Sequence, residues 1–345
     1  MHSCDVLIVG AGPAGSSCAW KLVRAGFDVA IADRARFPRD KVCGGWITPE
    51  VLSRREIEAY EGVLQPITSF RVGVIGGRSV QIHYGKPVSY GIRRREFDDY
   101  LLKRSGARVF EGTALETLER DRDAWIVNAS IRSRIVIGAG GHFCPVARKM
   151  GAKMTDAVVA QESEFEMTPA QIAQCQVHGD TPELYFSRDL LGYGWCFRKG
   201  DILNVGLGRA DPSRLADHVH EFVRWKVPFE IPAPHGHAYL LYGSSPRKTY
   251  GDGWMLIGDA AGLAYPFSGE GILPAIESGL IAAKVIANRE PFSSYPPRLE
   301  KHFGTPSTWL TSIGAKFPRR FLADHVVPTQ WFARDVVLGR WFLHS

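Results

Sequence analysis

The first part of the chain shows three successive hydrophobic patterns. Residues 5–9 are an apolar run, residues 10–15 are a glycine-rich turn, and residues 13–25 repeat apolar positions at helical spacing until Gly26. Residues 27–33 then read as a second strand. This strand-turn-helix-strand order is typical of the opening of a doubly wound α/β domain with a parallel sheet.

Later segments predict a second sheet that is interleaved with the first domain. Residues 70–83 and 158–241 contain alternating and β-branched segments, among them FRVGVI, SVQIHY and ILNVGLG, which are typical of strands. Between them, residues 95–104 (REFDDYLLKR) predict a helix, and residues 133–141 (SRIVIGAGG) predict a strand that ends in glycine. We therefore expect the first domain to be interrupted and resumed.

The composition of the chain mainly argues against certain kinds of site and partner. The 345 residues suffice for about two domains. The six cysteines form no CxxC pair and no cluster at zinc spacing, so we expect no disulfide framework and no metal site. The net charge of +6 is spread along the chain without a recognition motif, so we expect no nucleic-acid partner. No secretion signal and no membrane-spanning run is recognisable.

The turn GAGPAG carries the first candidate chemistry. Gly10 suits a tight turn, Gly12 lets backbone approach a pyrophosphate, and Gly15 allows close packing of helix on strand. The N-terminus of the following helix offers N–H groups to phosphate. Asp33, at the end of the second strand, is placed to accept ribose hydroxyls. A dinucleotide site follows, although this turn does not select the dinucleotide.

A second glycine segment, WMLIGDAAG, narrows the cofactor. An apolar strand ends at Gly258 and Asp259, where the carboxylate is placed to accept a ribityl hydroxyl, and PFSGEGI follows. The combination of GAGPAG, IGDAAG and PFSGEGI resembles the flavoprotein superfamily of para-hydroxybenzoate hydroxylase, flavin halogenases and geranylgeranyl reductases. That resemblance implies FAD; a strand-turn of a nicotinamide enzyme is the alternative interpretation.

Two further flavin contacts are expected. The helix over residues 271–287 would direct its positive N-terminal dipole at the isoalloxazine and stabilise the anionic reduced flavin. The resemblance also implies that Arg94 approaches the FAD. The alternatives are Arg93 or Arg95 as the contact, or a solvated basic cluster.

The segment KVCGGWITPE resembles the Cys-Gly-Gly loop of the geranylgeranyl reductases. There the paired glycines let backbone pass close to the flavin, and Cys43 would project towards the substrate and serve as a catalytic residue. The alternative is a small buried thiol without a role in the reaction.

The segment GYGWCFRKGDILNVGLG resembles a second motif of the same reductases, with Arg198 where the family has proline. Tyr193 and Trp195 are expected to line the substrate cavity, or alternatively to pack in the core of a hairpin. In IGAGGHFCPVARKM, Gly140 occupies the position of an aspartate of the aromatic hydroxylases, which argues against that branch. His142, Cys144 and Arg148 are candidates for part of the role of that aspartate, and for His142 a structural hydrogen bond is the alternative.

The expected organisation is a Rossmann-like FAD-binding domain interleaved with a mixed β-sheet substrate domain and followed by a helical C-terminal region. The FAD-binding domain would comprise residues 1–65, 91–155 and 246–290, the substrate domain residues 66–90 and 156–245, and the C-terminal region residues 291–345. The expected cofactor-binding residues are Gly10, Gly12, Pro13, Ala14, Gly15, Asp33, Arg34, Cys43, Gly44, Arg94, Gly258, Asp259, Gly269, Gly271 and Ile272.

The resemblance implies an FAD-dependent oxidoreductase that transfers hydride from reduced FAD to a carbon–carbon double bond of a hydrophobic substrate, with isoprenoids as the candidate class. The alternatives are an FAD-dependent monooxygenase that uses oxygen and a non-catalytic flavin redox sensor. No second glycine-rich nucleotide unit is recognisable, so the electron donor stays open between NAD(P)H, a ferredoxin and a flavin reductase.

The C-terminal segment adds an expectation about location. PFSSYPP at residues 291–297 reads as a linker, and aromatic and basic residues alternate over residues 309–341, with Pro318 and Pro328 dividing them into short helices. This pattern is compatible with a helix on a membrane surface or over a lipid-sized cavity, and packing against the FAD domain is the alternative. We expect a cytoplasmic protein with peripheral contact at the inner membrane face.

Overall fold

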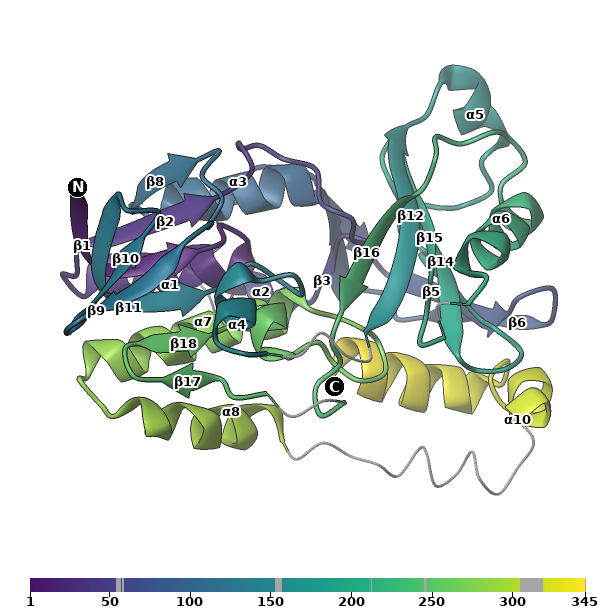
Figure 1. The fold of residues 1–345 in the computed structure, drawn as a ribbon. Coiled ribbons are helices and arrows are strands. Elements are labelled where there is room, and N and C mark those ends of the chain that lie inside the picture. The colour runs from purple at the N-terminus through teal and green to yellow at the C-terminus, as the bar shows by residue number, and fades with distance from the viewer. Residues whose placement is uncertain are drawn as a thin grey trace. The chain divides into compact units, whose positions relative to one another are not determined.

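A computed structural model describes residues 1–53, 57, 59–152, 157–211, 213–244, 247–304 and 319–344. The chain forms two compact units (Figure 1), each assembled from three stretches of sequence. Unit 1 comprises Met1–Asp40, Arg95–Ala157 and Tyr239–Pro306, and unit 2 comprises Lys41–Arg94, Val158–Ala238 and Ser307–Ser345. The finer division into the three domains expected from the sequence remains a prediction.

Unit 1 is built on a sheet in the order β17-β18-β11-β1-β2-β8, in which all neighbours from β18 to β8 are parallel. This is the doubly wound sheet that the opening pattern predicts, and its central strands are buried. Its strands are β1 (His2–Val9), β2 (Val29–Asp33), β8 (Arg108–Glu111), β9 (Leu118–Asp121), β10 (Ala124–Val127), β11 (Ile131–Gly138), β17 (Tyr250–Gly251) and β18 (Trp254–Leu256).

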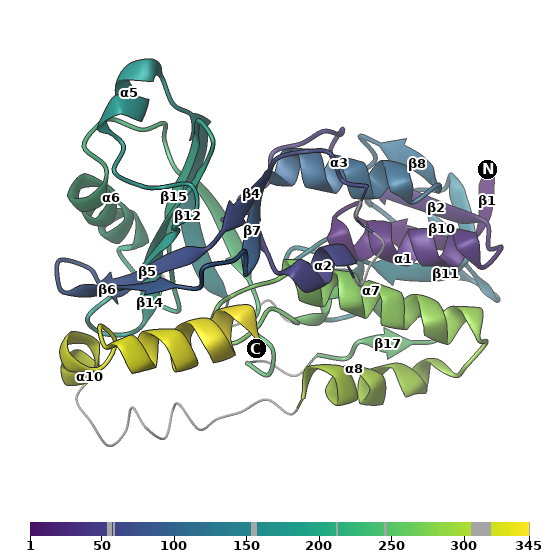
Figure 2. The same ribbon diagram turned by 180° about the vertical axis from the view of Figure 1, so that it is seen from behind.

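The helices of unit 1 include the three that the sequence predicts. α1 and α7 lie side by side (Figures 1 and 2), and a Cβ on Gly279 of α7 would overlap the carbonyl oxygen of Ala14 in α1. Only glycine therefore permits this close approach of the two helices. The elements are α1 (Pro13–Arg24), α3 (Arg94–Arg104, in unit 1 from Arg95), α4 (Pro145–Lys149), η1 (Gly258–Ala261), α7 (Ile272–Ala287), η2 (Phe292–Ser294) and α8 (Tyr295–Phe303).

The interpretation of residues 291–297 as a linker is wrong. Tyr295 starts α8, its ring is fully buried, and its hydroxyl donates to the carbonyl oxygen of Leu256 at 3.1 Å. Pro296 and Pro297 lie in the first turn of the helix, where the missing N–H groups have no intrahelical partner to lose. The prolines that suggested a linker therefore begin a helix.

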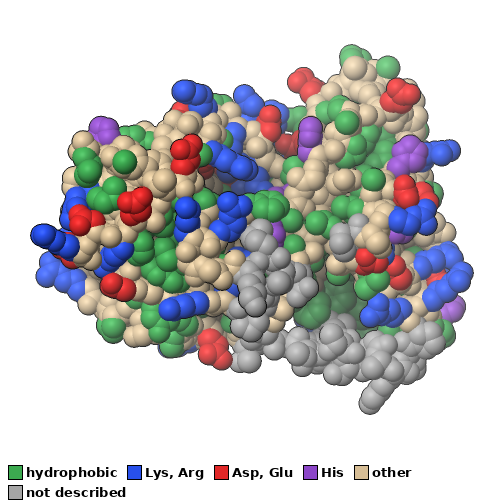
Figure 3. Space-filling model, viewed as in Figure 1, with side chains coloured by type: hydrophobic (Ala, Val, Ile, Leu, Met, Phe, Trp, Pro, Cys, Tyr) green, Lys and Arg blue, Asp and Glu red, His purple; other side chains and the backbone are tan. Residues whose placement is uncertain are grey.

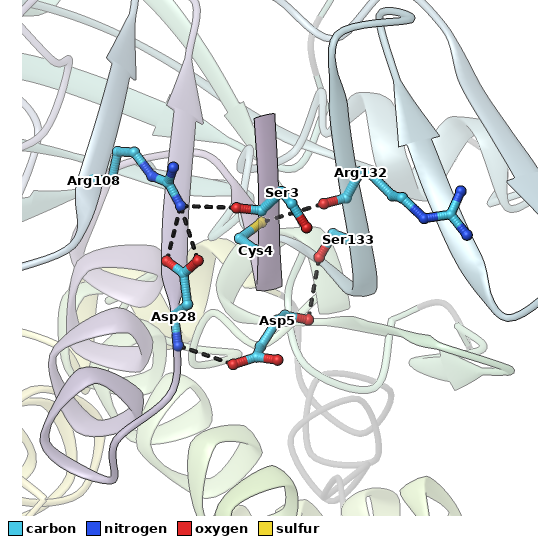
Figure 4. A network of polar contacts seen from close by, with 7 residues as sticks. All are labelled: Ser3, Cys4, Asp5, Asp28, Arg108, Arg132 and Ser133. Atoms are coloured by element: carbon cyan, nitrogen blue, oxygen red, sulfur yellow. Dashed lines mark hydrogen bonds and ion pairs between the residues drawn. The ribbon is translucent and has the colours of Figure 1, made fainter. Parts of the chain in front are cut away.

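The amino ends of the central strands are tied together by polar contacts at the end of the sheet away from the glycine turn (Figure 4). Arg108 donates to both carboxylate oxygens of Asp28, at 2.8 and 3.0 Å, and to the carbonyl oxygen of Ser3. Asp5 accepts from the backbone N–H of Asp28, and its carbonyl oxygen accepts from Ser133. These contacts join β1, β2, β8 and β11 and leave the carboxyl ends of the strands for a ligand.

Unit 2 contains a seven-stranded sheet in the order β16-β12-β15-β14-β13-β5-β6 and a small sheet in the order β3-β7-β4. The stretch expected to hold strands, residues 158–241, also contains two helices, α5 and α6. A Cβ on Gly194 would lie 2.6 Å from the ring of Phe222, so α6 packs closely on β14. The elements are β3 (Trp46–Ile47), α2 (Pro49–Ser53), β4 (Leu64–Ile67), β5 (Ser69–Val74), β6 (Ser79–His83), β7 (Ser89–Ile92), β12 (Val158–Glu166), α5 (Pro169–Gln174), β13 (Glu183–Phe186), β14 (Gly192–Lys199), β15 (Ile202–Arg209), α6 (Leu215–Lys226) and β16 (His235–Tyr239).

Beyond residue 304, the described part of the chain contains α10 (Arg319–His325) and the π-helix η3 (Phe332–Leu343). Phe342 is buried and stacks on Trp46, with centroids 5.0 Å apart and planes at 12°, and it meets Tyr193 edge to face at 5.6 Å. The inner face of η3 thus packs on aromatic residues of unit 2. Trp309 and Pro318, which the sequence singled out, lie outside the described residues.

The described residues contain neither a membrane-spanning helix nor a cluster of metal ligands. None of their helices is long and apolar enough to cross a membrane. They contain no group of three or more His, Cys, Asp or Glu side chains that could hold a metal ion, and the six cysteines are free. On the face drawn in Figure 3, lysine and arginine side chains are scattered among acidic and hydrophobic ones.

Candidate functional site: two glycine segments and the Cys43 loop

The turn after β1 has a shape that only glycine permits. Gly10 has a φ of +115°, and a Cβ there would overlap the carbonyl oxygen of Ala139 at the end of the neighbouring strand β11. A Cβ on Gly15 would in turn overlap the carbonyl oxygen of Gly10. The turn is therefore pressed against β11 on one side and against its own helix on the other, as the sequence predicts.

The same turn presents hydrogen-bonding groups. Gly12 is the N-cap of α1, and no side chain of the described residues caps this helix end. Asp33 accepts the backbone N–H of Ala11 at 2.7 Å through one carboxylate oxygen and that of Ala35 at 2.8 Å through the other. Each oxygen keeps a lone pair for a further donor. Asp33 thus shapes the turn and can still accept a ribose hydroxyl.

The second glycine segment meets the first within unit 1. Gly258 has a φ of +60°, and a Cβ there would lie 3.1 Å from the Cβ of Ala14. Its backbone N–H donates to the hydroxyl of Ser278 at 2.9 Å. A Cβ on Gly271, the N-cap of α7, would lie 3.2 Å from a carboxylate oxygen of Asp259. Two segments about 250 residues apart in sequence thus form one cradle.

This donor set fits FAD. The uncapped N-terminus of α1 suits a pyrophosphate, and the two partly buried carboxylates, Asp33 and Asp259, suit ribose and ribityl hydroxyls. Gly269 has a φ of +67° beside the hydroxyl of Tyr239, and Ile272 begins α7. Arg34 is exposed. The roles of the individual residues stay predictions.

Three consecutive arginines, Arg93 to Arg95, lie at the start of α3, and their environments differ. Arg94, the first residue of the helix, is only 8% exposed, whereas Arg93 is half-buried and Arg95 is exposed. Arg95 forms an ion pair with the exposed Asp40 at 3.2 Å. Burial therefore favours Arg94 over Arg95 as the residue that contacts the cofactor.

The Cys43 loop belongs to unit 2, where its glycines have a clear steric purpose. A Cβ on Gly44 would lie 2.9 Å from the ring of Phe197, and one on Gly45, whose φ is +65°, would overlap the carbonyl oxygen of Ile92 and the amine of Lys199. The paired glycines therefore let the loop lie directly on the strands of unit 2. Whether they also approach the flavin stays a prediction.

A polar cluster beneath this loop was missed by sequence reasoning. The backbone N–H of Cys43 donates to Glu162 Oε1, and its carbonyl oxygen accepts from Asn204 at 3.1 Å. Asn204 also donates to Glu164, and Lys199, almost fully buried, forms an ion pair with Glu164 at 2.7 Å. The one available signal was an acidic residue at every second position of the predicted strand QESEFE, which places these three glutamates on one face of the strand.

Glu162 is a buried carboxyl group with a raised pKa. It is 3% exposed, and burial raises its pKa to about 7, against the opposing effects of the Cys43 N–H and of Lys199. Its second oxygen, Oε2, is buried without a hydrogen-bond partner among the described residues. Near neutral pH the carboxyl group of Glu162 therefore exists in both protonation states.

Tyr193 and Trp195 have different surroundings on β14. Trp195 is buried and donates from Nε1 to Asn204 at 2.7 Å, which fits core packing. Tyr193 is half-buried, with ring contacts to Phe186, Trp195 and Phe342. Of the two expected cavity residues, Tyr193 is the one that keeps an accessible surface.

The segment around Gly140 has no acidic residue to replace the missing aspartate. A Cβ on Gly140 would lie 3.1 Å from Cys144, so the turn is tight. His142 is buried, and burial, followed by the charge of Arg247, lowers its pKa. Its Nδ1 makes no hydrogen bond to the described residues, which does not support the structural hydrogen bond considered above. Arg148 is exposed.

Comparison with known proteins agrees with this geometry. The family model described as FAD dependent oxidoreductase matches residues 5–73. A digeranylgeranylglycerophospholipid reductase of Methanocaldococcus jannaschii is 30% identical, over 87% of this chain and 83% of its own length. A menaquinone reductase of Mycobacterium tuberculosis is also 30% identical, over 88% and 81%. A geranylgeranyl diphosphate reductase of Rhodobacter capsulatus is 31% identical, over 81% and 74%.

Solved structures show the same fold. A geranylgeranyl bacteriochlorophyll reductase-like protein of Thermoplasma acidophilum superposes with a TM-score of 0.73 at 22% identity, covering 93% of this chain and 86% of its own. The halogenase PltM, solved in complex with FAD, superposes with a TM-score of 0.66 at 17% identity, covering 87% and 73%.

The parallel sheet, the glycine cradle and these matches define an FAD-dependent oxidoreductase. Within that class, the chain belongs to the geranylgeranyl reductase family.

Proposed function

We propose that this protein reduces carbon–carbon double bonds of a hydrophobic substrate of the isoprenoid class. Bound FAD supplies the hydride and its electron pair to one carbon, and a proton is added to the neighbouring carbon, so that the alkene is saturated as the flavin is oxidised. The main support is the family: the three reductases compared above are 30–31% identical over most of the chain, and two of them are named for geranylgeranyl substrates.

The residues of unit 1 would hold the cofactor. The N-terminus of α1 binds the pyrophosphate, Asp33 and Asp259 accept hydroxyl groups, and the N-terminus of α7 stabilises negative charge on the reduced flavin. This assignment is supported by the cradle of glycines that brings both segments together. We also propose Arg94, a buried residue of unit 2, as a cofactor contact.

The residues of unit 2 would handle the substrate. Cys43 is the candidate proton donor, with an ordered water as the alternative, and Cys43 and Tyr193 are both partly exposed. Tyr193 would contact the hydrocarbon. Trp195, held by its hydrogen bond to Asn204, would support this apolar wall of the substrate cavity. An apolar wall of this kind excludes water from the reacting bond.

A single-turnover experiment tests the reaction. The holoprotein is reduced with dithionite without oxygen, mixed with geranylgeranyl diphosphate, and followed by flavin absorbance and product mass. We expect reoxidation without oxygen and a mass gain of two hydrogens per bond reduced. Reoxidation only after oxygen is admitted, with a hydroxylated product, would instead establish the monooxygenase alternative, and no substrate-dependent reoxidation would leave the redox sensor.

The electron donor is proposed to be external, either NAD(P)H or a protein reductant. Anaerobic titration with NADH and NADPH, followed by absorbance, distinguishes them: bleaching by either nucleotide identifies it as the donor. If neither bleaches the flavin, a ferredoxin or flavin reductase remains.

We also propose a cytoplasmic location with peripheral contact at the inner membrane face through the C-terminal segment. Phe321 and Trp331 are 49% and 64% exposed, and the exposed Arg319, Arg320 and Arg334 would contact acidic headgroups. Flotation with acidic liposomes should weaken when Phe321 and Trp331 are both replaced by serine. Phe143→Ser, which removes a similarly exposed aromatic from unit 1, is the matched control and should float like the wild type.

A further inference from the structure

The backbone of Cys43 is held at two points by side chains of the seven-stranded sheet. Its N–H donates to Glu162 on β12, and its carbonyl oxygen accepts from Asn204 on β15 at 3.1 Å. The thiol itself accepts from the N–H of Gly45 at 3.4 Å. The peptide groups on both sides of Cys43 are therefore fixed, which sets the direction of its side chain.

Of the two anchors, Glu162 is the adjustable one. Asn204 does not titrate and is fully buried, with its amide shared among Trp195, Glu164 and Cys43. Glu162 titrates, and an ionised carboxylate makes a hydrogen bond about twice as strong as a neutral one. The strength of the anchor at the Cys43 N–H therefore depends on the charge of a single buried group.

Charged groups of two strands act on Glu162. Lys199 on β14 favours the ionised form, and Glu164, on β12 itself, opposes it. On the other side of β12 lies β16, where His237 is hydrogen-bonded to Lys41 of the loop segment. One buried cation thus lowers the pKa of Glu162 and one neighbouring acid raises it, and the burial of Glu162 has the largest effect on this pKa.

We propose that Glu162 is a positioning residue for Cys43: its carboxyl group holds the Cys43 loop on the sheet, and its ionisation tightens that hold. The proposal rests on the proposed function only in treating Cys43 as a group of the reaction site. When Glu162 is neutral the loop opens more often, and when Glu162 is ionised the thiol stays in one place. The reaction should accordingly favour the alkaline side of neutral pH, through kcat more than through KM.

Thiol labelling tests this directly. The holoprotein carries Cys175→Ser, because Cys43 and Cys175 are the two partly exposed cysteines and the others are buried. N-ethylmaleimide is added between about pH 5.5 and pH 8.5, and modification of Cys43 is measured by peptide mass spectrometry. Comparing variants at the same pH removes the direct effect of pH on the maleimide reagent. Hydrogen–deuterium exchange of the same peptide reports on the Cys43 N–H.

Three variants give distinct expectations. Glu162→Gln keeps an acceptor but cannot ionise, so its labelling rate should equal that of wild type near pH 6 and exceed it roughly threefold near pH 8. Glu162→Ala removes the acceptor and should label roughly tenfold faster than Glu162→Gln at every pH. Glu166→Gln, a matched change at an exposed position of β12, should behave as wild type.

Two results overturn the proposal: a Glu162→Gln to wild-type ratio that does not change with pH, or labelling of Glu162→Ala no faster than of Glu166→Gln. If Glu162→Ala yields no folded holoprotein, the pH dependence of the ratio between wild type and Glu162→Gln decides alone. This readout needs no substrate. A protein that fails to reduce alkenes but shows the expected labelling refutes the proposed function and leaves the positioning role standing.

Discussion

The glycine turn of unit 1 and the Cys43 loop of unit 2 both depend on glycines, but they are held in place differently. Around Gly10 and Gly15 the restraint is steric and comes mostly from backbone, with the side chains of Asp33 and Ser16 bonded to the turn. The Cys43 loop lies instead on a buried network of Glu162, Asn204 and Lys199.

This difference matches two kinds of task. A pyrophosphate is recognised by backbone N–H groups, so the turn needs one rigid shape at all pH values. In the role proposed for it, the thiol of Cys43 needs a defined direction that its own backbone cannot supply. Side chains from two distant strands supply it, and they introduce a titratable group. The contrast predicts that substitutions in the glycine turn of unit 1 act sterically, with an effect that does not depend on pH. Substitutions in the polar network of unit 2 should act through its hydrogen bonds and charges.

The largest effect is expected from Gly15→Ala. The new Cβ would overlap the carbonyl oxygen of Gly10, and backbone cannot yield as a flexible side chain does, so we expect a cost of about 3 kcal/mol or more and loss of bound FAD. The flavin content of the purified protein measures this at any pH. Gly141→Ala is the control: its φ is +71° but nothing lies within 4 Å, so it should cost about 1 kcal/mol and retain FAD. Equal loss in both variants would contradict the steric explanation.

The second effect concerns Asn204. Asn204→Ala removes the acceptor of the buried Trp195 N–H and the donor to the Cys43 carbonyl oxygen. Leaving a buried donor unsatisfied and creating a cavity should lower the unfolding free energy by about 3 kcal/mol. Urea unfolding of the holoprotein measures it, and FAD content should stay unchanged. Loss of FAD in this variant would show that the two regions are not independent.

The third effect tests the charge in unit 2. The pKa of Glu162 is raised from 4.5 to about 7 in the folded protein, so the folded state binds this proton more tightly than the unfolded chain. The resulting stability is complete below about pH 4.5 and is lost as pH rises to about 7. Glu162→Gln should therefore match wild type near pH 5 and be more stable by about 2 to 3 kcal/mol near pH 8. Thermal unfolding at both pH values checks this, and an equal difference at both would exclude a neutral Glu162.

The smallest effect separates two neighbouring arginines. Arg94→Ala should weaken FAD binding roughly tenfold, because a buried cation is lost. Arg95→Ala removes only an exposed ion pair with Asp40 and should change FAD affinity less than about twofold. Fluorescence titration of the apoprotein with FAD compares them. A larger loss of FAD affinity in Arg95→Ala than in Arg94→Ala would show that Arg95 makes the cofactor contact.

Much of unit 1 could be predicted because its signals are local. The run before Gly10, the helix after Pro13 and the strand ending at Asp33 form a contiguous pattern whose spacing leaves few alternative structures. The same holds for the strand before Gly258 and for α7. Where local pattern misled, at Tyr295, the reason was tertiary: a buried tyrosine hydroxyl bonded to Leu256 turns an apparent linker into a packed helix.

Unit 2 was predicted less completely because its contacts connect distant segments. Strand propensity indicated β12 and β15, but nothing in the sequence pairs Glu162 or Asn204 with Cys43, which precedes them by more than a hundred residues. The helix α6 within the expected strand region was missed for a related reason, since a short amphipathic segment acquires its stability from the sheet beneath it. The helix α5 buries none of its residues, and its capping box of Thr168 and Gln171 is a local signal that the sequence carries.

The sequence by itself determined the class of cofactor and the doubly wound sheet, because both follow from glycine spacing and from hydrophobic periods that each segment carries alone. The tertiary structure decided how Gly258 meets Ala14, which face of η3 is buried against Trp46, and which side chains hold the Cys43 loop. These depend on where the chain returns to itself, and burial then changes the chemistry of a residue such as Glu162 in a way that its position in the sequence does not reveal.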